Sequence, residues 1–146
     1  MSFAMSRAAC QQFMADVHVG VFSVGDEGRG PITVPLWYLY EPGGDIFLVT
    51  PATSRKVPLV RRAGRASFCV QDERPPFAYV SVEGAARVER VDTAPFVLKQ
   101  AVRYLGRVRG EAYAQKTAGD RGSEVLVRIT PQRWFSADFT ALIPPA

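Results

Sequence analysis

The segment from Thr50 to Phe68, TPATSRKVPLVRRAGRASF, combines residue types that can bind an anion. An apolar run stops at Thr50, small hydroxyl residues follow, and Arg55 and Lys56 stand together at the expected start of a short helix. The N–H groups and the dipole of a helix N-terminus favour negative charge. Arginine adds a planar fork of donors and lysine a point charge, so the segment predicts a phosphate site. A solvated basic pair after a turn is the alternative interpretation.

Side chains for acid–base or metal chemistry are scarce. His18 is the only histidine and falls in an apolar strand pattern, which favours a structural role. Cys10 and Cys69 have no metal-ligand spacing, so we expect no metal site and a reducing compartment. The sequence carries no Rossmann fingerprint, P-loop or nucleophile elbow. We therefore expect no catalytic side chain, and a bound cofactor would have to carry any reaction.

The elements that position this segment are mainly β-strands. Pro35 places the second strand at an edge or a bulge, and Gly84 predicts a bend in the fifth. Hairpins dominate early and no βαβ rhythm occurs, which favours a closed or partly closed antiparallel barrel with peripheral helices. The expected strands are 17–24, 32–40, 45–50, 65–71, 77–91, 124–130 and 133–139, and the other expected helices are 6–17, 93–108 and 111–117.

Composition indicates an ordinary globular protein. The 146 residues fit one domain, 1–146, and the apolar content of 47% and charged content of 22% are typical of soluble proteins. No apolar stretch is long enough for a membrane span, and the first residues lack a signal-peptide layout, so a cytoplasmic location is expected. The net charge of +4 is compatible with nucleic acid or with a small anionic ligand. The basic residues are dispersed and no aromatic ladder is evident, so we expect no nucleic-acid partner.

Four segments in order resemble the pyridoxamine 5'-phosphate oxidase-like split-barrel family, which binds FMN or a deazaflavin. They are FMADVHVGVFSV, GRGPITVPLWYLY, FLVTPATSRKVPLVRRAGRASFCV and AYVSVEGAARV. Each motif is weak alone, but four at family-like spacing are fairly specific. The resemblance implies a mainly β, six-stranded antiparallel split barrel that forms a homodimer with cofactor sites across the subunit interface.

The resemblance also implies which residues hold the cofactor. The segment from Val34 to Leu39 would run along the isoalloxazine-type ring, and Val49 and Thr50 would line the ring or phosphate end. The basic cluster of Ser54, Arg55 and Lys56 would bind the phosphate. Tyr79 stands where the pyridoxamine oxidases have a glutamine, and the resemblance implies a cofactor contact at this position. The full implied set is Val34, Pro35, Leu36, Trp37, Val49, Thr50, Ser54, Arg55, Lys56, Arg61 and Tyr79.

The chain departs from the vitamin B6 oxidases at its C-terminus, QRWFSADFTALIPPA, which has Arg133 but no histidine. It is more similar to short actinobacterial members, many of which use the deazaflavin coenzyme F420. Arg61, Arg62 and Arg65 would then meet the anionic tail of that coenzyme. The resemblance thus implies an F420- or FMN-dependent oxidoreductase that transfers hydride to or from a small unsaturated substrate. A non-catalytic carrier of a flavin, a deazaflavin or haem is the alternative.

Overall fold

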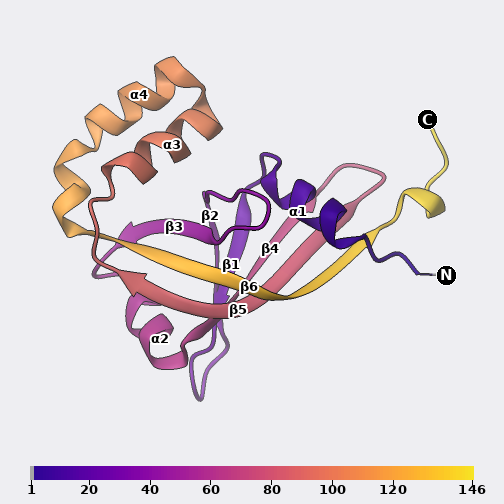
Figure 1. The fold of residues 1–146 in the computed structure, drawn as a ribbon, viewed down its shortest axis with the longest axis horizontal. Helices are drawn as coiled ribbons and strands as arrows, with labels where there is room; N and C mark the ends of the chain where they lie inside the picture. The colour runs from indigo at the N-terminus through magenta and orange to yellow at the C-terminus, as the bar shows by residue number, and fades with distance from the viewer. Residues whose placement is uncertain (1) are drawn as a thin grey trace.

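Six antiparallel strands form one curled sheet in the computed structural model, which describes residues 2–146 (Figure 1). The strand order is β2-β1-β4-β5-β6-β3, so β2 and β3 are the two edges of the sheet. Pro35 lies in the edge strand β2, as the sequence predicts, where a missing N–H costs no interior ladder bond. The strands are β1 (Gly20–Val24), β2 (Ile32–Leu36), β3 (Ile46–Pro51), β4 (Arg65–Asp72), β5 (Ala78–Glu89) and β6 (Glu124–Asp138).

A single bridge joins the connection that follows β2 to the edge strand β3. The N–H of Leu39 donates to the carbonyl of Phe47, and the N–H of Phe47 donates back, each over 3.0 Å. Within residues 2–146, the paired partner of β2 is β1 and that of β3 is β6, so no ladder continues from the bridge. In this part of the chain, the sheet therefore does not close by a ladder between β2 and β3, and the barrel is split between these two strands.

The long strands β5 and β6 form the spine of the sheet. Their register shifts between Glu83 and Gly84, which confirms the bend expected at Gly84. A Cβ at Gly84 would lie 1.8 Å from the carbonyl oxygen of Thr130, so only glycine allows this close approach. The prediction of two C-terminal strands was wrong: β6 runs through Pro131, because this proline lies at the bulge.

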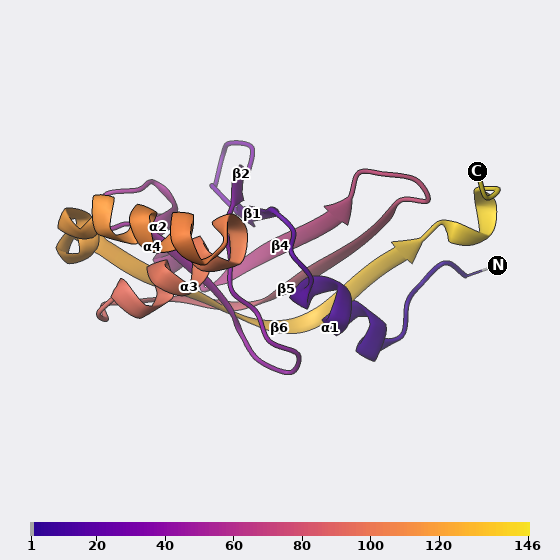
Figure 2. The same cartoon turned by 90° about the horizontal axis from the view of Figure 1, so that it is seen from above.

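The helices gather mainly at one end of the sheet. They are α1 (Arg7–Ala15), α2 (Lys56–Ala63), α3 (Ala94–Leu105) and α4 (Arg107–Lys116), with short 3-10 turns η1 (Ala118–Ser123) and η2 (Thr140–Leu142). The α3–α4 pair lies at the end of the molecule opposite both termini (Figures 1 and 2). No helix within residues 2–146 is both long and apolar enough to cross a bilayer.

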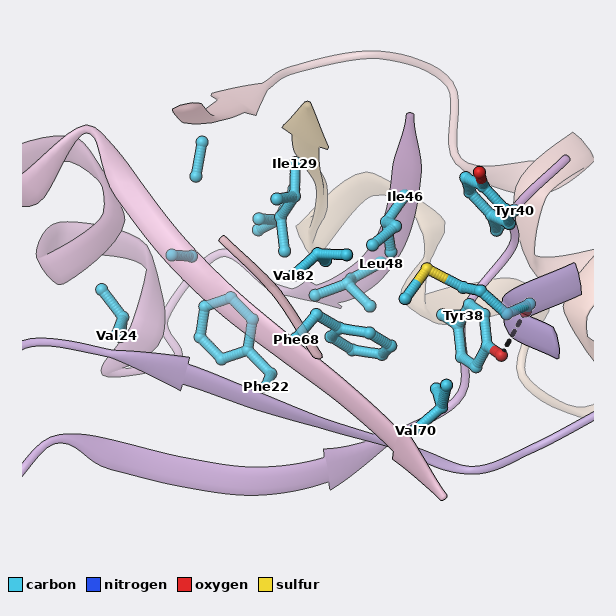
Figure 3. Close-up of a cluster of buried hydrophobic side chains, with 14 of the residues drawn as sticks. Phe22, Val24, Tyr38, Tyr40, Ile46, Leu48, Phe68, Val70, Val82 and Ile129 are labelled. Atoms are coloured by element: carbon cyan, nitrogen blue, oxygen red, sulfur yellow. Dashed lines mark hydrogen bonds between the residues drawn. The ribbon is translucent and has the colours of Figure 1, made fainter. Parts of the chain in front are cut away.

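The inner face of the curled sheet holds the core, which α1 helps to cover. Phe22, Phe68 and Tyr38 are fully buried there, and the rings of Tyr38 and Phe68 meet edge to face at 4.9 Å (Figure 3). The Tyr38 hydroxyl donates to the carbonyl of Met14 over 2.6 Å, so the polar tip of this buried ring has a partner. This bond ties the chain between β2 and β3 to the end of α1.

Candidate functional site

A cavity of about 380 Å³ lies beside the split, between β3 and the α3–α4 pair. Side chains alternate along β3, so Ile46 and Leu48 enter the core while Phe47 and Val49 face outward toward α3. Trp37, Val49 and Thr50 line one side of the cavity. The volume falls within the range typical of small-molecule sites. Three residues of the implied cofactor set are thus brought together by the fold.

Stacked aromatic rings hold Trp37 in place. Its ring lies parallel to that of Tyr104, with centroids 4.9 Å apart and an interplanar angle of 9°, and 5.4 Å from the ring of Tyr113. The Tyr104 hydroxyl donates to the carbonyl of His18 over 2.6 Å and accepts from the N–H of Tyr38. Residues from α3 and α4 therefore fix the orientation of a ring that belongs to the β2–β3 connection.

The far side of the cavity is polar. Gln100 lines it with only 6% of its surface exposed, and its Nε2 has no hydrogen-bond partner within the protein. Arg121 and Glu124 form an ion pair of 2.8 Å on the same side, and burial raises the pKa of Glu124. A buried amide without a partner is costly, so Gln100 is suited to bind a polar atom of a ligand.

The predicted basic cluster lies at the start of α2. Lys56 is half-buried, its ammonium donates to the Ser54 hydroxyl over 2.8 Å, and burial lowers its pKa. Arg55 is largely exposed and pairs with Asp26 of the β1–β2 turn over 2.9 Å. Within the first turn of α2, the N–H of Val57 already donates to Ser54 and Pro58 has none. The site therefore offers side-chain donors more than the free backbone N–H groups that we expected.

The basic cluster adjoins the cavity through the backbone. Pro51 and Ser123 both line the cavity. The carbonyl of Pro51 accepts from the N–H of Ser54 over 3.0 Å, and the carbonyl of Ser123 accepts from the N–H of Ala52 over 2.8 Å. The basic cluster thus follows directly in the chain on a residue of the cavity wall, although its own side chains do not line the cavity.

Comparison with known proteins places the fold. No protein-family model and no curated protein matches the chain. Among solved structures, the conserved hypothetical protein Rv2991 from Mycobacterium tuberculosis matches with a TM-score of 0.78 and 25% identity, over 99% of this chain and 92% of that one. An F420 reductase matches at 0.70 with 17% identity, over 86% and 94% of the two chains. A putative pyridoxamine 5'-phosphate oxidase from Listeria innocua matches at 0.59 with 16% identity, over 88% and 92%.

The chain has the pyridoxamine 5'-phosphate oxidase-like split-barrel fold. The predicted fold class is thereby confirmed, including the six antiparallel strands and the flanking helices. Within this split barrel, the split itself lies beside the cavity and the basic cluster.

The split barrel keeps some implied residues apart from the cavity. Val34 and Leu36 pack against the core from β2, whereas Pro35 points to the exposed outer face. Arg61 is exposed in the last turn of α2. Tyr79 lies at the far end of the β4–β5 hairpin, because Arg65, which follows α2, pairs with Ala85 while Tyr79 pairs with Gln71. Tyr79 and Lys56 of one chain therefore do not share one site.

The sequence prediction missed the residues that α3, α4 and η1 contribute. The helical spacing in 93–108 and 111–117 predicted both helices but not which face of each would meet β3. Residues 2–146 hold no cluster of three or more histidine, cysteine, aspartate or glutamate side chains arranged for a metal ion. The missed lining residues are Val97, Gln100, Tyr113, Thr117, Asp120, Arg121, Ser123 and Glu124.

Proposed function

We propose that the chain is an oxidoreductase that binds a phosphorylated deazaflavin, coenzyme F420, or FMN in the split of the barrel. The observation that supports this most is the junction of an aromatic-walled cavity with the half-buried Lys56 and its Ser54 partner. The similarity to an F420 reductase and a putative pyridoxamine 5'-phosphate oxidase agrees with it. Such a cofactor supplies hydride transfer to or from a small unsaturated substrate.

The residues present fit such a cofactor. Burial lowers the pKa of Lys56 because its charge is only partly solvated, and a phosphate would replace the lost water with an opposite charge. Ser54 adds a hydroxyl donor, and Arg55 can turn to the phosphate if it leaves Asp26. Trp37 and Val49 offer flat and apolar contact to a ring, and Gln100 an amide to its polar edge. The protein would position the ring and exclude water, with no side-chain acid required.

F420 is the favoured cofactor because basic residues continue along the chain from the phosphate site. Arg61 and Arg62 are exposed in the last turn of α2, and Arg65 follows at the start of β4. They would meet the anionic tail that F420 carries beyond its phosphate and that FMN lacks. Because FMN has no such tail, its binding would involve only the basic cluster of Ser54, Arg55 and Lys56.

Titration of the full chain with F420 and with FMN, followed by fluorescence, tests the proposal. Lys56→Ala should weaken the cofactor about 10- to 100-fold, as expected for loss of a charged hydrogen bond. Lys116→Ala, which removes an exposed lysine of α4, is the matched control. The double variant Arg61→Ala/Arg62→Ala should weaken F420 and leave FMN unchanged. Absence of micromolar binding of either cofactor, or equal binding by the Lys56 and Lys116 variants, would contradict the proposal.

A carrier without turnover is the second candidate, because side chains for acid–base chemistry are scarce in the sequence. Among residues 2–146, the one glutamate that lines the cavity, Glu124, is already paired with Arg121. A chain that binds the reduced cofactor tightly but reduces no quinone or enone would support the carrier. Steady oxidation of the reduced cofactor by either acceptor class would support the enzyme.

We also infer a homodimer, in which the second copy completes the cofactor site. Tyr79 is 37% exposed and lies far from Lys56 of its own chain, so it can contact a cofactor only from the other subunit. The outer face of the sheet around it also exposes apolar side chains, including Val19 and Phe135.

A further inference from the structure

A second and larger cavity, of about 780 Å³, lies on the other side of α3. Helix α3 separates the two cavities, because Val97 and Gln100 line the first while Phe96, Lys99 and Arg103 line the second. The opposite wall comes from the connection between β2 and β3 and from β3 itself. No residue lines both cavities, so this one is a separate site.

The wall of this second cavity combines aromatic and apolar side chains with charged ones. Phe47 and Phe96 face each other with ring centroids 5.6 Å apart, and Leu39 and Tyr40 extend the same surface. The volume lies in the range of small-ligand sites, and the lining offers both apolar contact and charged groups. A flat hydrocarbon body would fit beside these rings.

The charged groups of this cavity differ in whether they are already neutralised. Arg128 is paired with Asp45 over 3.5 Å and with Glu89 over 3.1 Å, so it needs no further anion. Lys99 and Arg103 lie four residues apart on α3, and neither is paired with a carboxylate within the described residues 2–146.

Arg103 is held in place by neutral groups, so no carboxylate in the described part of the chain balances its positive charge. Its guanidinium donates to the carbonyls of Ala15 and Asp16 over 3.0 and 2.7 Å and lies over the ring of Tyr38. Its Nε is buried and has no hydrogen-bond partner. Carbonyls neutralise only part of a cation, so a positive field remains beside the aromatic wall.

We propose that this second cavity binds a small aromatic carboxylate, with its ring against Phe47 and Phe96 and its carboxylate toward Lys99 and Arg103. A second negative charge on the ligand would be disfavoured by the carboxylate of Glu41, which also lines the cavity, whereas Asp45 is already paired with Arg128. This site does not depend on cofactor binding and can be tested on the cofactor-free chain.

Titration with 1-naphthoate, followed by NMR of backbone amides, tests the proposal, with neutral 1-naphthamide as the matched ligand. The amides of Phe47, Phe96 and Lys99 should shift with naphthoate at millimolar or lower concentration. Naphthamide and the variant Lys99→Gln should each weaken binding about fivefold, and salt should weaken naphthoate but not naphthamide. Lys116→Gln is the control, and Phe96→Ala should weaken both ligands.

Three results would overturn the proposal. One is equal affinity for naphthoate and naphthamide, which would remove the role of the cations. Another is shifts confined to Trp37 and Tyr113, which would place the ligand in the first cavity. The third is the absence of any shift at millimolar naphthoate in a chain whose spectrum shows it folded.

Discussion

The ammonium group of Lys56 is half-buried and donates to the hydroxyl of Ser54. Burial lowers its pKa from the ordinary value of 10.5. Between the lowered pKa and 10.5, the unfolded chain binds more protons than the folded chain. The contribution of Lys56 to the free energy of unfolding therefore rises with pH across that window, and Lys56→Met should remove this contribution.

We predict that Lys56 titrates at lower pH than the other two lysines, Lys99 and Lys116. Reductive ¹³C-methylation followed by NMR titration measures all three, since the chain contains only these. A bound phosphorylated cofactor should raise the pKa of Lys56 again, because an adjacent anion favours the ammonium form. A Lys56 signal that titrates with the other two would show that burial does not lower its pKa, and one that does not respond to the cofactor would show that no phosphate is bound there.

The basic pair could be predicted from the sequence because a strand end, hydroxyl residues and two cations are all local signals. The ion pair of Arg55 with Asp26 could not, because 29 residues separate the partners and only the tertiary fold brings them together. The same holds for Gln100, which in the sequence is one polar residue among several on a helix.

At the scale of elements, the close contact of α3 with α4 sets the position of the residues that these helices contribute to the wall of the first cavity. A Cβ at Gly110 would lie 2.6 Å from the Cα of Val102, so only glycine lets the two helices approach this closely. Tyr113 and Thr117 follow Gly110 on α4 and its C-cap and line the cavity. The position of these lining residues therefore depends on a glycine that makes no contact with a ligand.

Gly110→Ala should destabilise the chain by about 1–3 kcal/mol, because the added methyl group forces the helices apart. Cofactor affinity should fall as well, since Tyr113 would move away from Trp37. Thermal melting and cofactor titration measure the two effects. Gly119→Ala is the matched control, because a Cβ there meets nothing within 4 Å. Equal melting temperatures for the two variants would show that α4 can shift freely.

Secondary structure was predictable where the regular spacing of apolar residues continued over many positions without interruption, as in the strands β4 and β5 and in helix α3. The prediction was wrong at β6, because a proline such as Pro131 usually ends a strand but is accommodated here by the bulge opposite Gly84. A bulge is a property of two paired strands, so neither sequence alone contains it. The prediction that the second strand extends to residue 40 was also wrong in part, because residues 37–40 form a single bridge with β3 instead of a continuous strand.

At the scale of the whole molecule, the outer face of the sheet is the surface that the fold leaves uncovered. Val21, Cys69, Ser81 and Phe135 stand in one cross-strand row over four neighbouring strands. Phe135 is 52% exposed in this row, and exposed apolar surface of this kind marks association sites. The sequence predicted an antiparallel barrel, but the residues of its outer face become one surface only when the register between the strands is known.

We therefore predict that the chain is a dimer in solution and that Phe135→Asp makes it monomeric, because a charge on this face would be desolvated without a partner. Light scattering after size-exclusion chromatography measures the mass. Val108→Asp, on an even more exposed residue of α4, should leave the dimer intact. Because Tyr79 can meet a cofactor only from the second subunit, the monomer should also bind cofactor more weakly than the Val108 variant does. A wild-type monomer, or a folded Phe135 variant that remains dimeric, would remove the outer sheet face as the interface.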